Sequence, residues 1–215
     1  MVKPIAIIGF GGHAHVVRSA LLASGRDVLA ATCLDPAGCG EPPVAGLTLH
    51  TDESLVRAHS ANEIDLCLGL GTVNADSEMG HRQEVVKYFT RLGYKFVGVR
   101  HPTAWICSTA DVAVTAQVHA GVVIQPGAVV QDFAIVNTKA SVDHDCRVGK
   151  YCHIAPGATL SGNVELSDYA HVGTGASIIQ GVAVGVGAMV GAGATVVRSV
   201  ADGVCVVGTP ARELQ

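Results

Sequence analysis

The 215-residue sequence has few charged side chains and even fewer aromatic ones. Asp, Glu, Lys and Arg make up 15% of it and Phe, Trp and Tyr 4%, whereas glycine occurs 26 times. A broad globular core normally uses large side chains to fill its volume. This composition therefore favours a narrow, regular core of small side chains, as in repeat folds.

Basic clusters and long apolar runs are also missing. The net charge is −4 and no block of Lys or Arg occurs, which argues against a nucleic-acid partner. No run of about 18 apolar residues could span a bilayer. The apolar run at residues 5–8 ends at Gly9, which makes it too short for a signal peptide. We therefore expect a cytoplasmic protein with no membrane partner.

The seven cysteines lack the spacing of a metal site or a redox pair. No two of them form a C-x-x-C motif, so we expect neither zinc nor a redox disulfide. Cys146 and Cys152 fall on core positions of the repeat described next, where we expect them to act as small hydrophobic side chains.

The second half of the chain repeats with a period of six. Sixteen aliphatic residues recur at this interval: Ile106, Val112, Val118, Ile124, Val130, Val136, Val142, Val148, Ile154, Leu160, Leu166, Val172, Ile178, Val184, Val190 and Val196. A small or medium residue follows each one four positions later, from Ala110 to Val200, and neither series contains a charge. A period of six fits neither an α-helix nor an amphipathic strand. It predicts a parallel β-helix with three flat faces and one hexad per face, so that three hexads complete a coil.

The first hundred residues predict a small α/β domain. Apolar runs at residues 5–8, 28–34, 64–70 and 96–99 read as strands. Helices are expected up to about residue 24, over about 52–59 and over about 77–92, the last with a C-cap signal ending at Gly93. A Gly/Pro-rich loop is expected after Asp35 through residue 46. Alternating strands and helices favour a parallel sheet resembling half of a dinucleotide-binding fold. We expect an α/β domain over residues 1–101 and the β-helix with a C-terminal tail over residues 102–215.

A glycine turn follows the first predicted strand. Gly9, Gly11 and Ala14 satisfy G-x-G-x-x-A, a turn in which backbone N–H groups at a helix N-terminus approach a phosphate. Asp35 ends the second strand and is placed to contact a ribose. Since the domain is only half of a dinucleotide fold, a mononucleotide or nucleotide sugar is favoured over NAD. A purely structural turn is the alternative.

His144 lies between two carboxylates in Asp143-His144-Asp145, at an outward position of its hexad. A neighbouring carboxylate can fix the tautomer of an imidazole and stabilise its protonated form, which suits a general base near neutral pH. The alternative is a solvated surface histidine. The three-hexad coil places Gly162 above His144 and is expected to leave open space over the ring, and it places His171 above His153.

Taken together, these motifs resemble the bacterial nucleotide-aminosugar acetyltransferases of the hexapeptide-repeat, sialic acid O-acetyltransferase-like family, including those that acetylate GDP-perosamine. The resemblance covers nearly the whole chain. It rests on residues 9–13, 34–35, 67–69, 137–145, 151–153 and 207–212. The family commonly has Glu-His-Glu where this chain has Asp143-His144-Asp145.

The resemblance implies a left-handed β-helix, a homotrimer with active sites between adjacent subunits, and acetyl-CoA as acyl donor without a metal. It implies that His144 is the general base and that Asp145 orients it, with Asp143 as second choice. The remaining implied site residues are His153, Thr174 and Ala192 for acetyl-CoA, Asn137 near the sugar, and Gly11, Gly12, His13, Asp35 and Gly69 for the nucleotide sugar.

The expected reaction is N-acetylation of a 4-amino-4,6-dideoxy sugar, with GDP-perosamine favoured over UDP- or dTDP-linked acceptors. Three alternatives stay open. The chain could be a sugar O-acetyltransferase or a non-enzymatic nucleotide-sugar-binding protein. It could also be a zinc enzyme on the same solenoid, which would need three converging histidines. His144 and His153 are only half a coil apart, which argues against the zinc enzyme.

Overall fold

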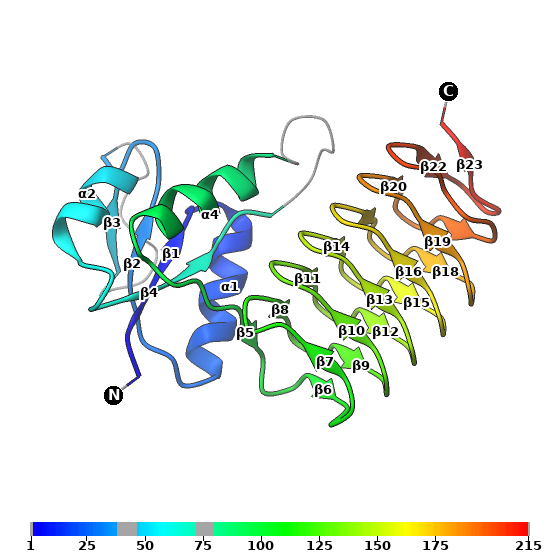
Figure 1. The fold of residues 1–215 in the computed structure, drawn as a ribbon, viewed down its shortest axis with the longest axis horizontal. Helices are drawn as coiled ribbons and strands as arrows, with labels where there is room; N and C mark the ends of the chain where they lie inside the picture. The colour runs from blue at the N-terminus through cyan, green and yellow to red at the C-terminus, as the bar shows by residue number, and fades with distance from the viewer. Residues whose placement is uncertain (1, 38–46, 72–79, 215) are drawn as a thin grey trace. The chain divides into compact units, whose positions relative to one another are not determined.

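The structure is a computed structural model that describes residues 2–37, 47–71 and 80–214. It consists of two compact units, which are divided between Val99 and Arg100 (Figure 1). The sequence-based boundary lies between residues 101 and 102. The division falls inside β5 (Val99–Arg100), a strand that belongs to a sheet of the solenoid, while Val99 itself is part of the core of the first unit.

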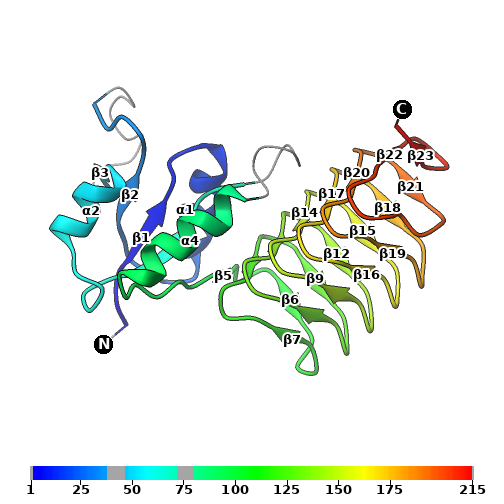
Figure 2. The same cartoon turned by 45° about the horizontal axis from the view of Figure 1, so that its top comes forward.

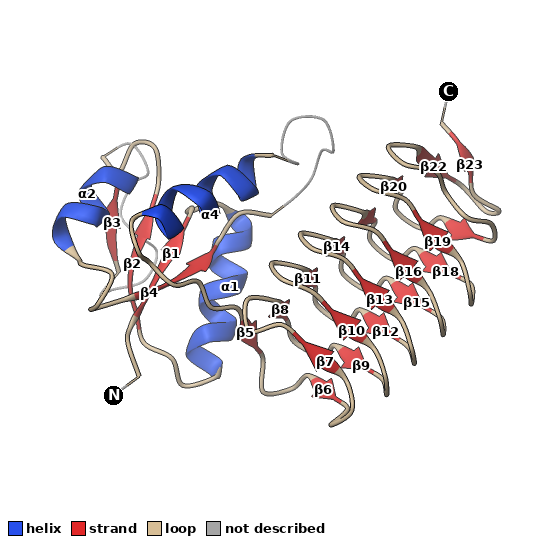
Figure 3. Cartoon of the chain, in the orientation of Figure 1, coloured by secondary structure: helices blue, strands red, loops and turns tan. Residues whose placement is uncertain are grey.

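The first unit contains a four-stranded parallel sheet in the order β3-β2-β1-β4 (Figure 3). Its strands are β1 (Ile5–Ile8), β2 (Val28–Thr32), β3 (Thr48–His50) and β4 (Asp65–Leu68). The expected small parallel sheet is confirmed. The short strand β3 was not predicted. The strand expected at residues 96–99 is reduced to one bridge between Phe96 and Leu66, followed by β5.

Three described helices flank this sheet: α1 (Gly12–Ala23), α2 (Asp52–Ala58) and α4 (His81–Arg91). Reciprocal bonds between Thr51 and Ser54 cap the N-terminus of α2, with the Ser54 N–H donating to Thr51 Oγ1 over 3.1 Å. Gly93, at φ +88, follows α4 as the C-cap signal predicted. The predicted start of this helix near residue 77 and the loop expected through residue 46 lie outside the described residues.

The second unit is a parallel β-helix, so the predicted fold class is confirmed. Besides β5 its strands are β6 (Trp105–Ile106), β7 (Asp111–Val112), β8 (Gln117–Val118), β9 (Val123–Ile124), β10 (Val129–Val130), β11 (Ile135–Val136), β12 (Ser141–Val142), β13 (Arg147–Val148), β14 (His153–Ile154), β15 (Thr159–Leu160), β16 (Glu165–Leu166), β17 (His171–Val172), β18 (Ser177–Ile178), β19 (Ala183–Val184), β20 (Met189–Val190), β21 (Thr195–Val196), β22 (Cys205–Val207) and β23 (Arg212–Glu213). They form an eight-stranded face, a six-stranded face and a five-stranded face.

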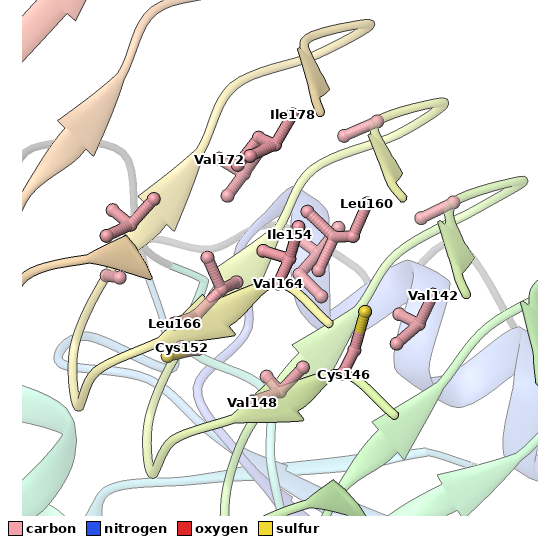
Figure 4. Packing of buried hydrophobic residues seen from close by; sticks show 14 of the residues in the cluster. Val142, Cys146, Val148, Cys152, Ile154, Leu160, Val164, Leu166, Val172 and Ile178 are labelled. Carbon is pink, nitrogen blue, oxygen red and sulfur yellow. The ribbon is translucent and has the colours of Figure 1, made fainter. Parts of the chain in front are cut away.

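Each strand pairs with the strand one coil away. Val142 on β12 is in register with Leu160 on β15, which is in register with Ile178 on β18, so one coil is three hexads long, as predicted. Figure 4 shows these side chains pointing into the interior with Cys146 and Cys152. Both aliphatic and small positions of the repeat are buried from Val112 to Val200. Ile106 and Ala110, in the first coil, are only partly buried.

From Gly121 to Gly193, every hexad turns its corner through one residue in the left-handed backbone conformation. Seven of these residues are glycines; the others are Phe133, Lys139, Asp145, Tyr151, Asn163 and Tyr169, with φ between 58 and 65. The three aromatic ones stack along one corner, with centroids 5.0 and 5.4 Å apart. The corner conformation is therefore imposed by the repeat rather than by glycine alone.

The solenoid ends in a shortened coil and a reversed strand (Figure 2). Met189 on β20 pairs with Cys205 on β22, so this coil is two positions shorter than the three-hexad repeat. β23 then pairs antiparallel with β22. The reversed strand ends the parallel stack and covers part of the last coil's backbone, which would otherwise be an open edge.

Within the described ranges, no helix has both the length and the apolar character needed to cross a membrane.

We expect Leu160→Ala to lower the free energy of unfolding by about 2–5 kcal/mol, since it leaves a cavity in a core that small side chains cannot refill. Leu160 is fully buried. Chemical denaturation measures the loss. Thr159→Ala on the same strand is the matched control, because Thr159 is exposed and should change stability by less than about 0.5 kcal/mol. Equal losses in the two variants would contradict the assigned register.

Candidate active site

His144 lies on a corner of the solenoid, between β12 on the six-stranded face and β13 on the five-stranded face. Its backbone is tied to the next coil, because Asn163 N–H donates to the His144 carbonyl over 2.9 Å. Its side chain remains 57% exposed. The repeat thus fixes the backbone while leaving the imidazole accessible to a small molecule.

The imidazole is paired with Asp145. His144 Nδ1 lies 2.9 Å from Asp145 Oδ2, whereas Asp143 Oδ1 accepts a 2.7 Å bond from the backbone N–H of His144. An ionised carboxylate can only accept, so Nδ1 carries the proton and Nε2 is left with its lone pair. Of the two candidate partners, Asp145 is therefore the one that contacts the ring.

The hydrogen bond that Nδ1–H donates to Asp145 raises the pKa of His144 above its usual value of 6.5, and the negative charges of Asp143 and Asp145 act in the same direction. The opposing effect of desolvation is smaller than that of the bond. A raised pKa makes the neutral imidazole a stronger base for accepting a proton from a substrate.

The expectation of open space over the His144 ring is wrong. Gly162 does lie one coil above, but the ring has turned onto it: a Cβ on Gly162 would come 2.5 Å from Cε1 and 3.0 Å from Cδ2 of His144. The ring turns this way because Nδ1 is directed to Asp145, which swings the opposite edge of the imidazole over the glycine.

Asn137 and His153, assigned to different ligands by the resemblance, lie next to each other. Asn137 Nδ2 is 3.1 Å from His153 Nε2, and Asn137 Oδ1 accepts from the Thr138 N–H over 2.8 Å. With its oxygen occupied, the amide nitrogen donates to His153. His153 and Asn137 are only 8% and 9% exposed. The bond between them therefore gives each of these buried polar side chains a hydrogen-bond partner.

Thr174 and Ala192 are stacked one coil apart at the corner that follows the eight-stranded face. The carbonyl of Thr174 accepts from the Gly193 N–H over 2.9 Å, and both Thr174 and Ala192 are exposed. At Gly173 an added Cβ would come 2.6 Å from the Ala192 nitrogen, so only glycine fits this close to the next coil. His153 and His171 stand on the preceding strands, with ring centroids 5.0 Å apart.

The first unit has a cleft of about 790 Å³ at the carboxyl ends of β1 and β2. Gly11 and Asp35, both expected to bind the nucleotide sugar, line it. Gly11 is the N-cap of α1, and nothing lies within 4 Å of where its Cβ would be. The helix N-terminus therefore presents backbone N–H groups to open space, the usual arrangement for binding a phosphate.

The other predicted nucleotide residues do not line the cleft. Gly12 and His13 lie in the first turn of α1. Gly69 has a structural role: an added Cβ would come 2.5 Å from Ile7 Cγ2 and 2.9 Å from Ala14 Cβ, so the absence of a side chain lets α1 pack closely on the sheet. Gly9, the first glycine of the predicted turn, does line the cleft, and its φ of +103 requires glycine there.

Sequence reasoning missed several residues of this cleft. Those that line it include Phe10, Leu34, Thr51, Asp52, Glu53 and His81. Asp52 and Glu53 come from the start of α2, which only the fold brings beside the glycine turn. Among the described lining residues there is no Lys or Arg, so backbone N–H groups would have to carry most of any phosphate binding.

Comparison with solved structures places the whole chain in one family. PerB from Caulobacter crescentus, in complex with CoA and GDP-perosamine, is 34% identical, with a TM-score of 0.87 over 100% of this chain and 99% of that one. The acetyltransferase domain of PglB from Neisseria gonorrhoeae is 34% identical, with a TM-score of 0.86 over 99% and 100%. This chain is a nucleotide-aminosugar acetyltransferase of the hexapeptide-repeat family.

WeeI from Acinetobacter baumannii is a more distant relative, 25% identical with a TM-score of 0.77 over 99% of this chain and 100% of that one. No family model and no curated protein matches this chain.

In the part of the chain that the structure describes, no three His, Cys, Asp or Glu side chains are grouped to hold a metal.

We expect Asp145→Asn to lower the pKa of His144, because the variant removes both the charged acceptor and its field. NMR titration of the imidazole measures the shift. Asp143→Asn is the matched control: Asp143 bonds the backbone rather than the ring, so its variant should lower the pKa less. A larger shift in Asp143→Asn would show that the wrong carboxylate has been paired with the ring.

Proposed function

We propose that this acetyltransferase transfers the acetyl group of acetyl-CoA to the 4-amino group of a nucleotide-linked 4-amino-4,6-dideoxy sugar, with GDP-perosamine as the favoured acceptor. The observation that carries the proposal is the His144–Asp145 pair on a whole-chain match to PerB, whose structure contains CoA and GDP-perosamine. A structure of the PglB domain contains acetyl coenzyme A. Both substrates of such a reaction point to the cytoplasm.

The two substrates would use different parts of the chain. The nucleotide would occupy the cleft of the first unit, with its phosphates at the N-terminus of α1 and its ribose at Asp35. Acetyl-CoA would lie along the solenoid beside His153, Thr174 and Ala192. Gly12 and His13, in the first turn of α1, would offer backbone N–H groups to the phosphates. Gly69 would let α1 pack closely on the sheet. Asn137 would hold His153 in place while facing the sugar.

The reaction is a direct transfer in which His144 handles one proton. The amine attacks the thioester carbonyl carbon, a C–N bond forms, and the C–S bond breaks to release CoA. Nε2 of His144 takes the proton that the amine loses, since Nδ1 is already committed to Asp145. A positioned base contributes about 10²–10⁴-fold to such a step. Holding the amine and the thioester together contributes further.

The active sites would lie between subunits of a homotrimer. His144 follows β12 of the six-stranded face. Exposed apolar side chains lie on or just after strands of that same face: Trp105 at 51%, Ile179 at 37% and Val197 at 37% exposed. A subunit that covered this face would bury them and border His144 at the same time.

We expect His144→Asn to lower kcat by about 10²–10⁴-fold, while the dissociation constant for CoA and the trimer mass stay unchanged. Steady-state assays, calorimetry and light scattering measure the three quantities. His101→Asn is the control, because His101 lies outside the site and should leave kcat unchanged. Near-wild-type turnover in His144→Asn would remove the general base from the proposal.

We expect acetylation of GDP-perosamine to have a higher kcat/KM than acetylation of UDP- or dTDP-linked 4-amino-4,6-dideoxy sugars. The acetyl-CoA assay should also include the matching sugar with a hydroxyl in place of the amine. Preferred turnover of that hydroxyl sugar would make the protein an O-acetyltransferase. Binding of the nucleotide sugars without any turnover would make it a binding protein.

A further inference from the structure

The His144–Asp145 pair lies between two glycines that come from neighbouring coils. Gly162 lies one coil after His144 in the sequence, and Gly127 lies one coil before Asp145. An added Cβ on Gly162 would meet the imidazole, and one on Gly127 would meet the Asp145 carboxylate. Each member of the pair therefore occupies the space that a side chain in the adjacent coil would take.

The backbone does not explain why residue 162 is glycine. Its φ lies outside the left-handed region, and the three nearest atoms to its missing Cβ all belong to the His144 ring. Other coils hold large residues in the same column: Pro126, Gln180 and Arg198. This corner position accepts side chains elsewhere, so the imidazole is what excludes one here.

The backbone explains Gly127 only in part. Its φ is +72, but Asp145 and Asn163, which hold the same corner position in the next two coils, adopt φ of 59 and 58. Asp and Asn tolerate this conformation well. What distinguishes residue 127 is the Asp145 carboxylate: Oδ1 lies closer to the missing Cβ than real Cβ contacts allow, and Cγ lies at 3.5 Å.

We propose that Gly127 and Gly162 are positioning residues that form a slot for the base and its carboxylate. The slot rests on the proposed role of His144 in catalysis. Gly162 leaves room for the Nε2 edge of the ring while Nδ1 stays on Asp145, and Gly127 lets the carboxylate reach Nδ1. A side chain at either position pushes one partner away. A displacement of about 1 Å at a reacting group can cost about 10²-fold in rate.

The first test is Gly162→Ala, assayed in the wild type and in His144→Ala. In the wild-type background we expect kcat to fall about 10–100-fold, with the KM for acetyl-CoA and the melting temperature little changed. In the His144→Ala background the same substitution should have no further effect, because there is no ring to displace. An unchanged kcat in the first background, or an equal fall in both, would overturn the role of Gly162.

The second test compares Gly127→Asn with Gly181→Asn. Gly181 holds the same corner position with φ +71 and has nothing within 4 Å of its missing Cβ, so it is a matched control. We expect Gly127→Asn to lower kcat and to lower the pKa of His144 measured by NMR, since the carboxylate moves off Nδ1. Gly181→Asn should change neither. Equal effects in the two variants would overturn the role of Gly127.

His144→Ala alone separates the slot from the proposed function. If His144→Ala retains wild-type turnover, the general base is wrong whatever the glycine variants do. If His144→Ala loses activity while Gly162→Ala and Gly127→Asn remain at the wild-type level, the base stands and the slot fails.

Discussion

The solenoid depends on a double constraint on its backbone. Every sixth residue must point an aliphatic side chain inward, while each strand must bond to the strands one coil away on either side. Neither condition can be relaxed locally, because a slip of one residue would bring an outward side chain into the core. The outward positions carry no such requirement, so polar and catalytic groups can occupy them without disturbing the stack.

The His144 corner shows how this rigidity serves chemistry. A histidine on a free loop would lose much conformational entropy each time it was aligned with a substrate. Here the backbone on both sides is held by bonds to adjacent coils, and only the side-chain torsions remain. Asp145 and the bare backbone at Gly162 then restrict those torsions. The cleft of the first unit also relies on backbone groups, since its described lining contains no Lys or Arg.

The sequence alone predicted the β-helix, its register and the position of His144, because a strict period determines which residues stack. It also predicted the parallel sheet, and it singled out Gly11 and Asp35, which line the cleft. It did not predict β3, which is very short, or the contribution of α2, which depends on long-range packing. The register placed Gly162 over His144 correctly, but the space between them was misjudged, since a side-chain rotamer is not encoded in a period. The site roles themselves stay predictions.

The three-hexad register also limits how such a chain can change its length during evolution. Gain or loss of one whole coil would leave all later columns on their faces and alter only the length of the rod. Gain or loss of a single hexad would rotate everything beyond it by one face. If that happened between His153 and Thr174, the corner with Thr174 and Ala192 would no longer follow the face that carries His153. Viable length variants should therefore differ by complete coils, or change only the ends, where the last coil is already shortened.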